Sequence, residues 1–166
     1  MKAYQDLSDD YAKTLLENIN VGVLSTVDAD GAPYGVPINF VTIDGSIFFH
    51  GGMGGEKMEN LGRDPRCCLT VTWFRGYERT GDSCCNTTTL YQSAVIRGTA
   101  RAVTDRDRKR EVLRELSDRI VPERNADPMD DRIVDITTVM EIVPESVTGR
   151  CRNHDPSKKA YRLDMA

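Results

Sequence analysis

The stretch from residue 21 to residue 57 reads VGVLSTVDADGAPYGVPINFVTIDGSIFFHGGMGGEK, and its pattern decides the fold. Three β-rich runs are separated by two short turns that contain Asp-Gly, a pair that tolerates positive φ. The runs cover residues 21–27, about 34–43 and 47–50, with turns at 28–31 and 44–45. Pro37 indicates an edge strand or a bulge, because proline cannot donate to a ladder. The stretch predicts an antiparallel meander.

The flanking sequence adds helices and longer strands. We expect a helix over 9–19, capped at Ser8, and a charged helix from Asp105 to about Ile120. Gly98 indicates a bend or bulge in its strand. The other expected elements are a short helix ending near 64–65, strands at 67–74, 91–103 and 133–143, and loops at 75–89 and 121–132. Six strands with two main helices predict a small antiparallel barrel.

The 166 residues carry a formal net charge of −4 and are 39% hydrophobic. This length fits one domain, and we place it at residues 1–150, followed by a charged tail at 151–166. A mildly acidic chain is not expected to bind nucleic acid, which requires a basic surface. The N-terminus lacks an apolar leader, and no run is long enough to span a membrane, so we expect a cytoplasmic protein without a membrane partner.

Five cysteines fall as Cys67-Cys68, Cys84-Cys85 and Cys151. An odd number without finger spacing predicts neither a disulfide framework nor a metal site. Adjacent cysteines in a strand point to opposite faces, so neither pair is expected to serve one metal ion. Reduced thiols are the favoured interpretation, and a redox role for Cys84-Cys85 stays open.

The glycine-rich run 51–55 opens the short helix, with Lys57 in the first turn. Glycines let backbone N–H groups approach an anion, and a helix N-terminus adds partial positive charge. The run therefore predicts a phosphate pocket beside a barrel face. It is neither a Walker A loop nor a dinucleotide fingerprint, and a surface turn with a solvated lysine is the alternative.

His50 precedes this run at a strand end. Its near-neutral pKa suits a hydrogen bond to a flavin or substrate, or a proton transfer. The alternative is a packed or hydrogen-bonded structural histidine. Asn39 either faces water or contacts a polar ring edge.

The order of these residues resembles the pyridoxamine-phosphate-oxidase-like flavoproteins, and more narrowly their nitroimidazole-resistance branch. The resemblance spans about residues 10–150 and is most specific from Gly31 to Lys57. It implies a six-stranded, FMN-binding split β-barrel that forms a homodimer with the flavin between subunits. The C-terminal signature for a pyridoxal phosphate substrate is not reproduced at 147–151.

The resemblance also implies roles for individual residues. The strand from Pro37 to Val41 would lie along the isoalloxazine edge, and His50, Gly51 and Lys57 near the ribityl phosphate. Ser93 would approach the flavin from another strand. The residues expected to bind the cofactor are Pro37, Ile38, Asn39, Phe40, Val41, His50, Gly51, Lys57 and Ser93. His50 is the expected catalytic residue.

Two functions remain open. The first is an FMN-dependent oxidoreductase that reduces a small aromatic or nitroaromatic compound with electrons from an external donor. The second is a non-catalytic protein that carries or senses a flavin, or binds a haem or deazaflavin instead.

Overall fold

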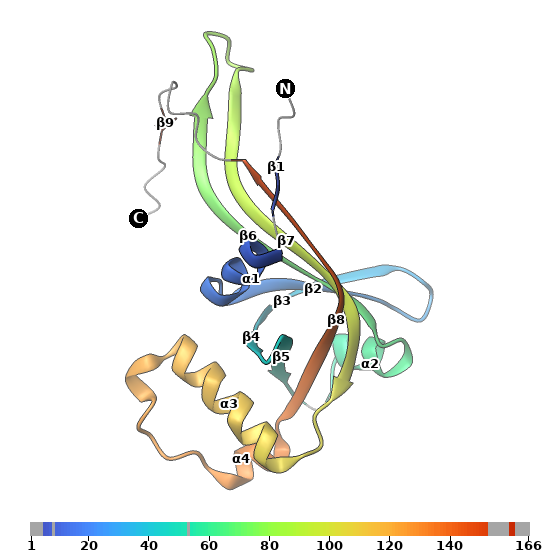
Figure 1. The fold of residues 1–166 in the computed structure, drawn as a ribbon. Helices are drawn as coiled ribbons and strands as arrows, with labels where there is room; N and C mark the ends of the chain where they lie inside the picture. The colour runs from blue at the N-terminus through green and yellow to red at the C-terminus, as the bar shows by residue number, and fades with distance from the viewer. Residues whose placement is uncertain (1–4, 8, 53, 153–159, 162–166) are drawn as a thin grey trace.

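The computed structural model describes residues 5–7, 9–52, 54–152 and 160–161 (Figure 1). The helices are α1 (Asp9–Asn18), α2 (Glu56–Arg63), α3 (Arg106–Ile120), the 3₁₀ turn η1 (Pro122–Arg124) and α4 (Asp131–Ile136). The strands are β1 (Gln5–Leu7), β2 (Val21–Val27), β3 (Pro33–Asn39), β4 (Val41–Ile43), β5 (Ser46–Gly51), β6 (Arg66–Arg79), β7 (Thr87–Ala102), β8 (Thr138–Arg152) and β9 (Ala160–Tyr161). No helix in this part of the chain is long and apolar enough to cross a membrane.

The strands form one antiparallel sheet in the order β3-β2-β6-β7-β8-β5-β4, with β1 added to β8 and β9 to β6. The sheet curls until β3 and β5 approach each other, giving the expected split-barrel form. The main path has seven strands in the described residues, rather than six, because the run 34–43 divides at Phe40. The N–H of Phe40 leaves the ladder and donates to the carbonyl oxygen of Asn20 at 3.2 Å.

The core has two parts on opposite sides of β5. Phe49 lies inside the barrel with Phe40, whereas its neighbour Phe48 packs under α3 with Val112. All four side chains are essentially inaccessible to water. The alternation along β5 therefore fixes the barrel to α3, and it leaves the end of this strand, at His50 and Gly51, free to form a site.

Several local predictions are confirmed. The helix over 9–19 is α1, and β2 has the expected bounds. Asp105 caps α3, its carboxylate accepting the N–H of Arg108 at 2.7 Å. The pairing of β7 with β8 shifts at Gly98, where a Cβ would lie 2.2 Å from the carbonyl oxygen of Val143.

The loop predicted at 75–89 is wrong. β6 and β7 continue through most of it as a paired hairpin, and Figure 1 shows this hairpin extending away from the barrel at the end opposite α3. Gly76, with φ of 115°, absorbs an irregularity in the pairing. Polar residues on a two-stranded ribbon can face water on both sides, so their composition resembles that of a loop.

The strand predicted at 133–143 is also wrong at its start, whereas the loop predicted at 121–132 is confirmed up to Asp130, with the 3₁₀ turn η1 inside it. Residues 131–136 form α4, whose cap Asp130 accepts the N–H of Arg132 at 2.8 Å. β8 begins only at Thr138 and runs to Arg152. The β-branched residues of α4 favour a strand locally, whereas the cap and packing against α3 select the helix.

Candidate functional site

The end of β5 and the start of α2 meet at a corner formed by His50, Gly51 and Lys57, here called the β5–α2 corner. A Cβ added to Gly51 would lie 2.9 Å from Cε of Met58, 3.2 Å from Cε of Lys57 and 3.3 Å from its Nζ. The lysine side chain therefore folds back over the Gly51 backbone, and any larger residue there would displace it. The atoms in the way are the flexible ends of Lys57 and Met58, so a side chain at this position would move these two groups and leave the backbone in place.

The first turn of α2 presents backbone donors at the same corner. Gly55 occupies the N-cap position with φ of 104°, which favours glycine, and no side-chain hydrogen bond caps the helix. The N–H of Met58 donates to the carbonyl oxygen of Gly55 at 2.9 Å, so the N–H groups before it precede the helical ladder. With the Lys57 ammonium, these groups suit a bound phosphate. Glu56, in the same turn, opposes an anion.

His50 lies beside this positive charge on β5, where it pairs with Val139 of β8. His50 is exposed, but the atoms around the strand end partly desolvate its imidazole, and this desolvation, followed by the positive charge of Lys57, lowers the pKa of His50 from its ordinary value of 6.5. The ring is therefore neutral at neutral pH, with one nitrogen that donates a hydrogen bond and one that accepts. The Lys57 ammonium itself lies 5.9 Å from the centre of the buried Phe49 ring.

The strand expected to line the ring edge divides into exposed and buried residues. Pro37 and Asn39 are exposed on β3, which is an end strand of the sheet path. Ile38, Phe40 and Val41 are at most 5% exposed and pack in the two cores. Only their backbone groups can contact a ligand.

Cross-strand register places Pro37 and Asn39 on one continuous surface with Ser93. Val23 pairs with Pro37 on one side and with Thr70 on the other, Thr70 pairs with Val95, and Ser93 lies two residues from Val95 on β7. Paired residues share a face, as do residues two apart. This outer face consists of Val21, Val23, Pro37, Asn39, Thr70, Ser93 and Val95.

A single chain does not bring Ser93 to the β5–α2 corner. Ser93 pairs with Arg150 on β8, whereas His50 pairs with Val139, which is roughly 35 Å earlier along the same strand. The structure thus gathers His50, Gly51 and Lys57 at the corner, and Pro37, Asn39 and Ser93 on the outer face.

Two features of this site were missed by sequence reasoning. Val21 and Val23 are 52% and 45% exposed on the outer face, although they are apolar. The signal was present in β2, which has apolar residues on both of its faces. The second feature is Arg119 of α3, which holds the Asn20–Phe40 junction and has no sequence signal.

A comparison with models of protein families shows to which family this chain belongs. The model of the pyridoxamine 5'-phosphate oxidase family matches residues 8–151. The chain belongs to this family. No protein of curated function matches the sequence of this family member.

Solved structures share the oxidase-family fold. A Bacteroides thetaiotaomicron protein described as a 5-nitroimidazole antibiotic resistance protein is 21% identical, with a TM-score of 0.69 over 90% of this chain and 89% of its own. A flavocytochrome from Azotobacter vinelandii is 19% identical, with a TM-score of 0.79 over 99% and 82%. A protein from Mycobacterium smegmatis that binds FAD and heme is 23% identical, with a TM-score of 0.79 over 93% and 76%.

Proposed function

We propose that this protein binds FMN, with the phosphate at the β5–α2 corner, and uses it to reduce a small aromatic or nitroaromatic compound. The observation that carries the proposal is Lys57 folded over Gly51 at a helix N-terminus without a side-chain cap. These groups offer a phosphate one full positive charge together with backbone donors. Membership in the pyridoxamine 5'-phosphate oxidase family supports a flavin as the phosphate's carrier.

The isoalloxazine ring would extend from the corner along β3, where the exposed Pro37 and Asn39 and the backbone of this end strand can contact it. Within its own chain Ser93 shares the outer face with Pro37 and Asn39 but is distant from the corner, so a flavin anchored at one chain's corner could also meet the Ser93 of a second chain. We therefore infer a homodimer that covers the outer face and holds flavin between subunits. The exposed Val21 and Val23 provide the apolar contact that such an interface needs.

A bound flavin would supply the electron transfer, and the chain would position and protect it. His50 supplies a neutral imidazole beside the site, because its pKa is lowered. Its N–H can hold a polar substrate group, and protonation of the ring at lower pH would make it a proton donor. The likeness in fold to the B. thetaiotaomicron resistance protein suggests nitroaromatic compounds as the substrates to try first.

A second candidate function is cofactor binding without turnover. The A. vinelandii flavocytochrome and the M. smegmatis protein, whose folds are similar, support it, since one is named for flavin and cytochrome content and the other for FAD and heme. In that case the corner would still hold a phosphate, but His50 would have no catalytic role.

The visible spectrum of the purified protein, before and after incubation with FMN, tests the proposal. Oxidised-flavin bands that stay with the protein through gel filtration support it. A Soret band, or a protein that never retains FMN, contradicts it. With FMN bound, anaerobic reduction of a nitroaromatic by an added pyridine nucleotide separates an enzyme from a binder.

The role of His50 is tested at saturating FMN. We expect His50→Ala to lower nitroaromatic turnover about tenfold or more, on the scale of one lost proton-transfer or hydrogen-bonding group. His50→Gln, which keeps a donor, should retain more activity. Full turnover in His50→Ala would remove the residue from the reaction.

A further inference from the structure

The tip of the β6–β7 hairpin is a turn that carries two adjacent thiols. The N–H of Asn86 donates to the carbonyl oxygen of Ser83 at 2.9 Å, which places Cys84 and Cys85 at the two central positions. The N–H of Thr80 donates to the carbonyl oxygen of Asn86 at 2.7 Å and joins the turn to the strand end. Both cysteines are exposed and free.

This turn changes the relation between the two side chains. Neighbours in a strand point to opposite faces, but the Sγ atoms of Cys84 and Cys85 lie only 3.9 Å apart. The rule of opposite strand faces therefore does not apply to this pair, because the residues form a turn and not a strand.

The distance between the two sulfur atoms is closer to that of two thiolates bound to one shared atom than to that of a disulfide bond. A disulfide bond measures about 2.05 Å, so its formation would require a large approach of the two atoms. Two thiolates on one tetrahedral ion, at metal–sulfur bonds of about 2.3 Å, lie roughly 3.8 Å apart. The observed 3.9 Å is a normal contact between two sulfur atoms, and the two thiols would need only a small approach to share one centre.

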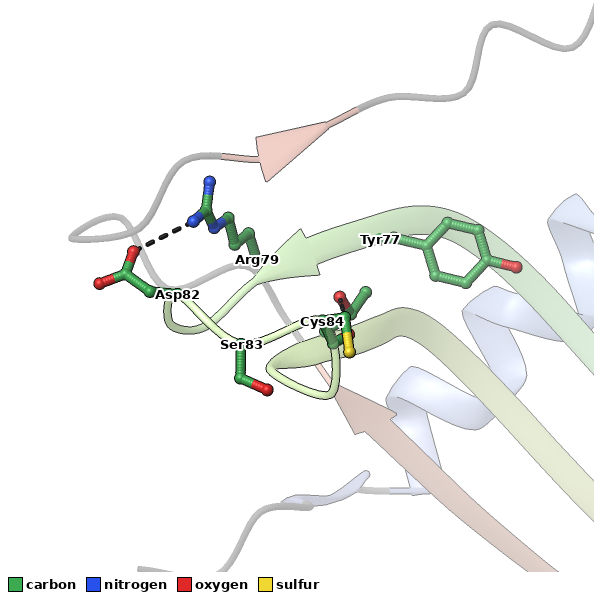
Figure 2. Close-up of a pocket in the computed structure, with 6 residues that line it drawn as sticks. Tyr77, Arg79, Asp82, Ser83 and Cys84 are labelled. Atoms are coloured by element: carbon green, nitrogen blue, oxygen red, sulfur yellow. Dashed lines mark hydrogen bonds and ion pairs between the residues drawn. The ribbon is translucent and has the colours of Figure 1, made fainter.

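A hollow of about 430 Å³ lies beside Cys84 (Figure 2). Tyr77, which is 39% exposed, is the aromatic residue at the edge of this hollow, and its ring packs edge-on against Phe74 with 5.1 Å between the ring centres. Arg79 lies at the same hollow, its guanidinium fixed by the carbonyl oxygen of Gly81 at 2.8 Å and by the Asp82 carboxylate at 3.0 Å. A centre bound to the thiols could thus carry an organic substituent into this space.

The number of ligands restricts what can bind. Among the residues that the structure describes, no three His, Cys, Asp or Glu side chains form a cluster for a metal ion. A tetrahedral ion would receive only two protein ligands here and would be held weakly. A trivalent arsenic centre with one organic substituent needs only two thiolates.

We propose that Cys84 and Cys85 form a chelating dithiol site for monosubstituted trivalent arsenicals, with the organic group in the Tyr77 hollow. Both S–H bonds break and two S–As bonds form. The arsenic-bound oxygen leaves as water with the two protons, and arsenic stays trivalent, so no oxidant or reductant takes part. The site is independent of flavin binding, because the tip lies far along the hairpin from the β5–α2 corner (Figure 1).

The chain contains its own matched control in a second adjacent pair. Cys67 and Cys68 lie within β6, Cys67 buried and Cys68 half-buried. The Cys67 thiol faces the carbonyl oxygen of Gly98 at 3.6 Å, and burial raises its pKa to about 11. Two adjacent cysteines in a strand should not chelate one centre.

Titration of the full-length, reduced protein with phenylarsine oxide tests the site, read by thiol counting and by intact mass under non-denaturing conditions. We expect one arsenical per chain and the loss of two fast-reacting thiols. A small dithiol should restore both thiols, whereas a monothiol at the same concentration should not. Cys84→Ser and Cys85→Ser should each weaken binding about 100-fold, with Cys67→Ser and Cys68→Ser unchanged.

The proposal is overturned if either tip variant binds as tightly as the wild type, if one thiol is lost per arsenical, or if the arsenical links two chains. Binding of cadmium ion alone at the tip, without phenylarsine oxide binding, would also overturn the assigned ligand class. Circular dichroism of the serine variants, whose substitutions are at an exposed turn, should match the wild type.

Discussion

The β5–α2 corner and the outer face are built in different ways. At the corner, Gly51 and Lys57 are only a few residues apart, and one turn with one helix brings them into contact. On the outer face, Pro37, Val23 and Ser93 come from three strands and meet only through sheet register. One region is complete within a chain, whereas the other presents exposed apolar side chains. The proposed phosphate site is thus formed by neighbouring residues of one chain, whereas the proposed site for the isoalloxazine ring needs a second subunit.

Val23→Asp tests the outer face and should have the largest effect. A carboxylate buried in a subunit interface without a partner costs about 3 kcal/mol or more. The dissociation constant of the dimer should therefore rise at least 100-fold. The fold should persist, since Val23 is 45% exposed in one chain. Sedimentation velocity over a concentration series measures this.

The matched control is Ile133→Asp on α4, which is 50% exposed and lies away from the outer face. It should leave the dimer intact. A wild-type protein that is monomeric at all concentrations, or equal dimers in both variants, would exclude the outer face as the interface.

Arg119→Ala tests the junction between the two regions, where Phe40 joins β3 to β4. Arg119 donates to the Asn20 side chain and to the carbonyl oxygens of Leu16 and Ile19 at 2.6–2.9 Å. Its guanidinium lies 5.6 Å from the centre of the Phe40 ring. We expect a loss of about 2 kcal/mol in the free energy of unfolding, measured by urea denaturation.

Arg114 of the same helix provides the comparison. It also donates to two carbonyl oxygens, those of Asn125 and Asp127, but in an exposed loop. Arg114→Ala should cost less than about 1 kcal/mol. Equal losses for the two alanine variants would show that the Asn20–Phe40 junction contributes nothing special.

Glu56→Gln refines the corner and should have a smaller effect. Glu56 is exposed in the first turn of α2, where its charge repels a bound phosphate. Its removal should tighten FMN binding about two- to threefold, near 0.5 kcal/mol. Glu115→Gln, exposed on α3, should change nothing. Unchanged or weaker binding in Glu56→Gln, measured by flavin fluorescence quenching, would place the phosphate elsewhere.

The corner should also leave a small signature in the pH dependence of stability. Because the pKa of His50 is lowered on folding, the unfolded chain binds the proton more readily. The free energy of unfolding should therefore fall as pH drops from about 7 through the lowered pKa. His50→Asn should flatten this slope in urea titrations, while His154 is present in both proteins. An identical slope would contradict the partial desolvation of the imidazole.

The contrast between features formed by neighbouring residues and features formed by distant strands also explains what the sequence could predict. β2, α1 and the Asp105 cap follow from local patterns and are confirmed. The hairpin at 75–89 depends on pairing between distant residues, such as Tyr77 with Thr89, and its polar composition resembles a loop.

At the site, the glycine run and Lys57 predicted a phosphate pocket, because helix N-termini have local signals. The Lys57 side chain lies over Gly51 because of the path that the backbone takes between them. That path cannot be read from the residue types alone. The sequence order could not separate the exposed Asn39 from the buried Phe40, since that depends on where the strand breaks. Ser93 as a cofactor contact stays a prediction that depends on the second chain.

The most direct test of the phosphate grip compares FMN with riboflavin, which lacks the phosphate, in Lys57→Ala and in the exposed-lysine control Lys13→Ala. Loss of one charged hydrogen-bonding group should weaken FMN binding about 30-fold, near 2 kcal/mol, and leave riboflavin binding unchanged. Lys13→Ala should bind both ligands as the wild type does. An equal change for FMN and riboflavin in Lys57→Ala, or no change for either, would contradict a phosphate held at the β5–α2 corner.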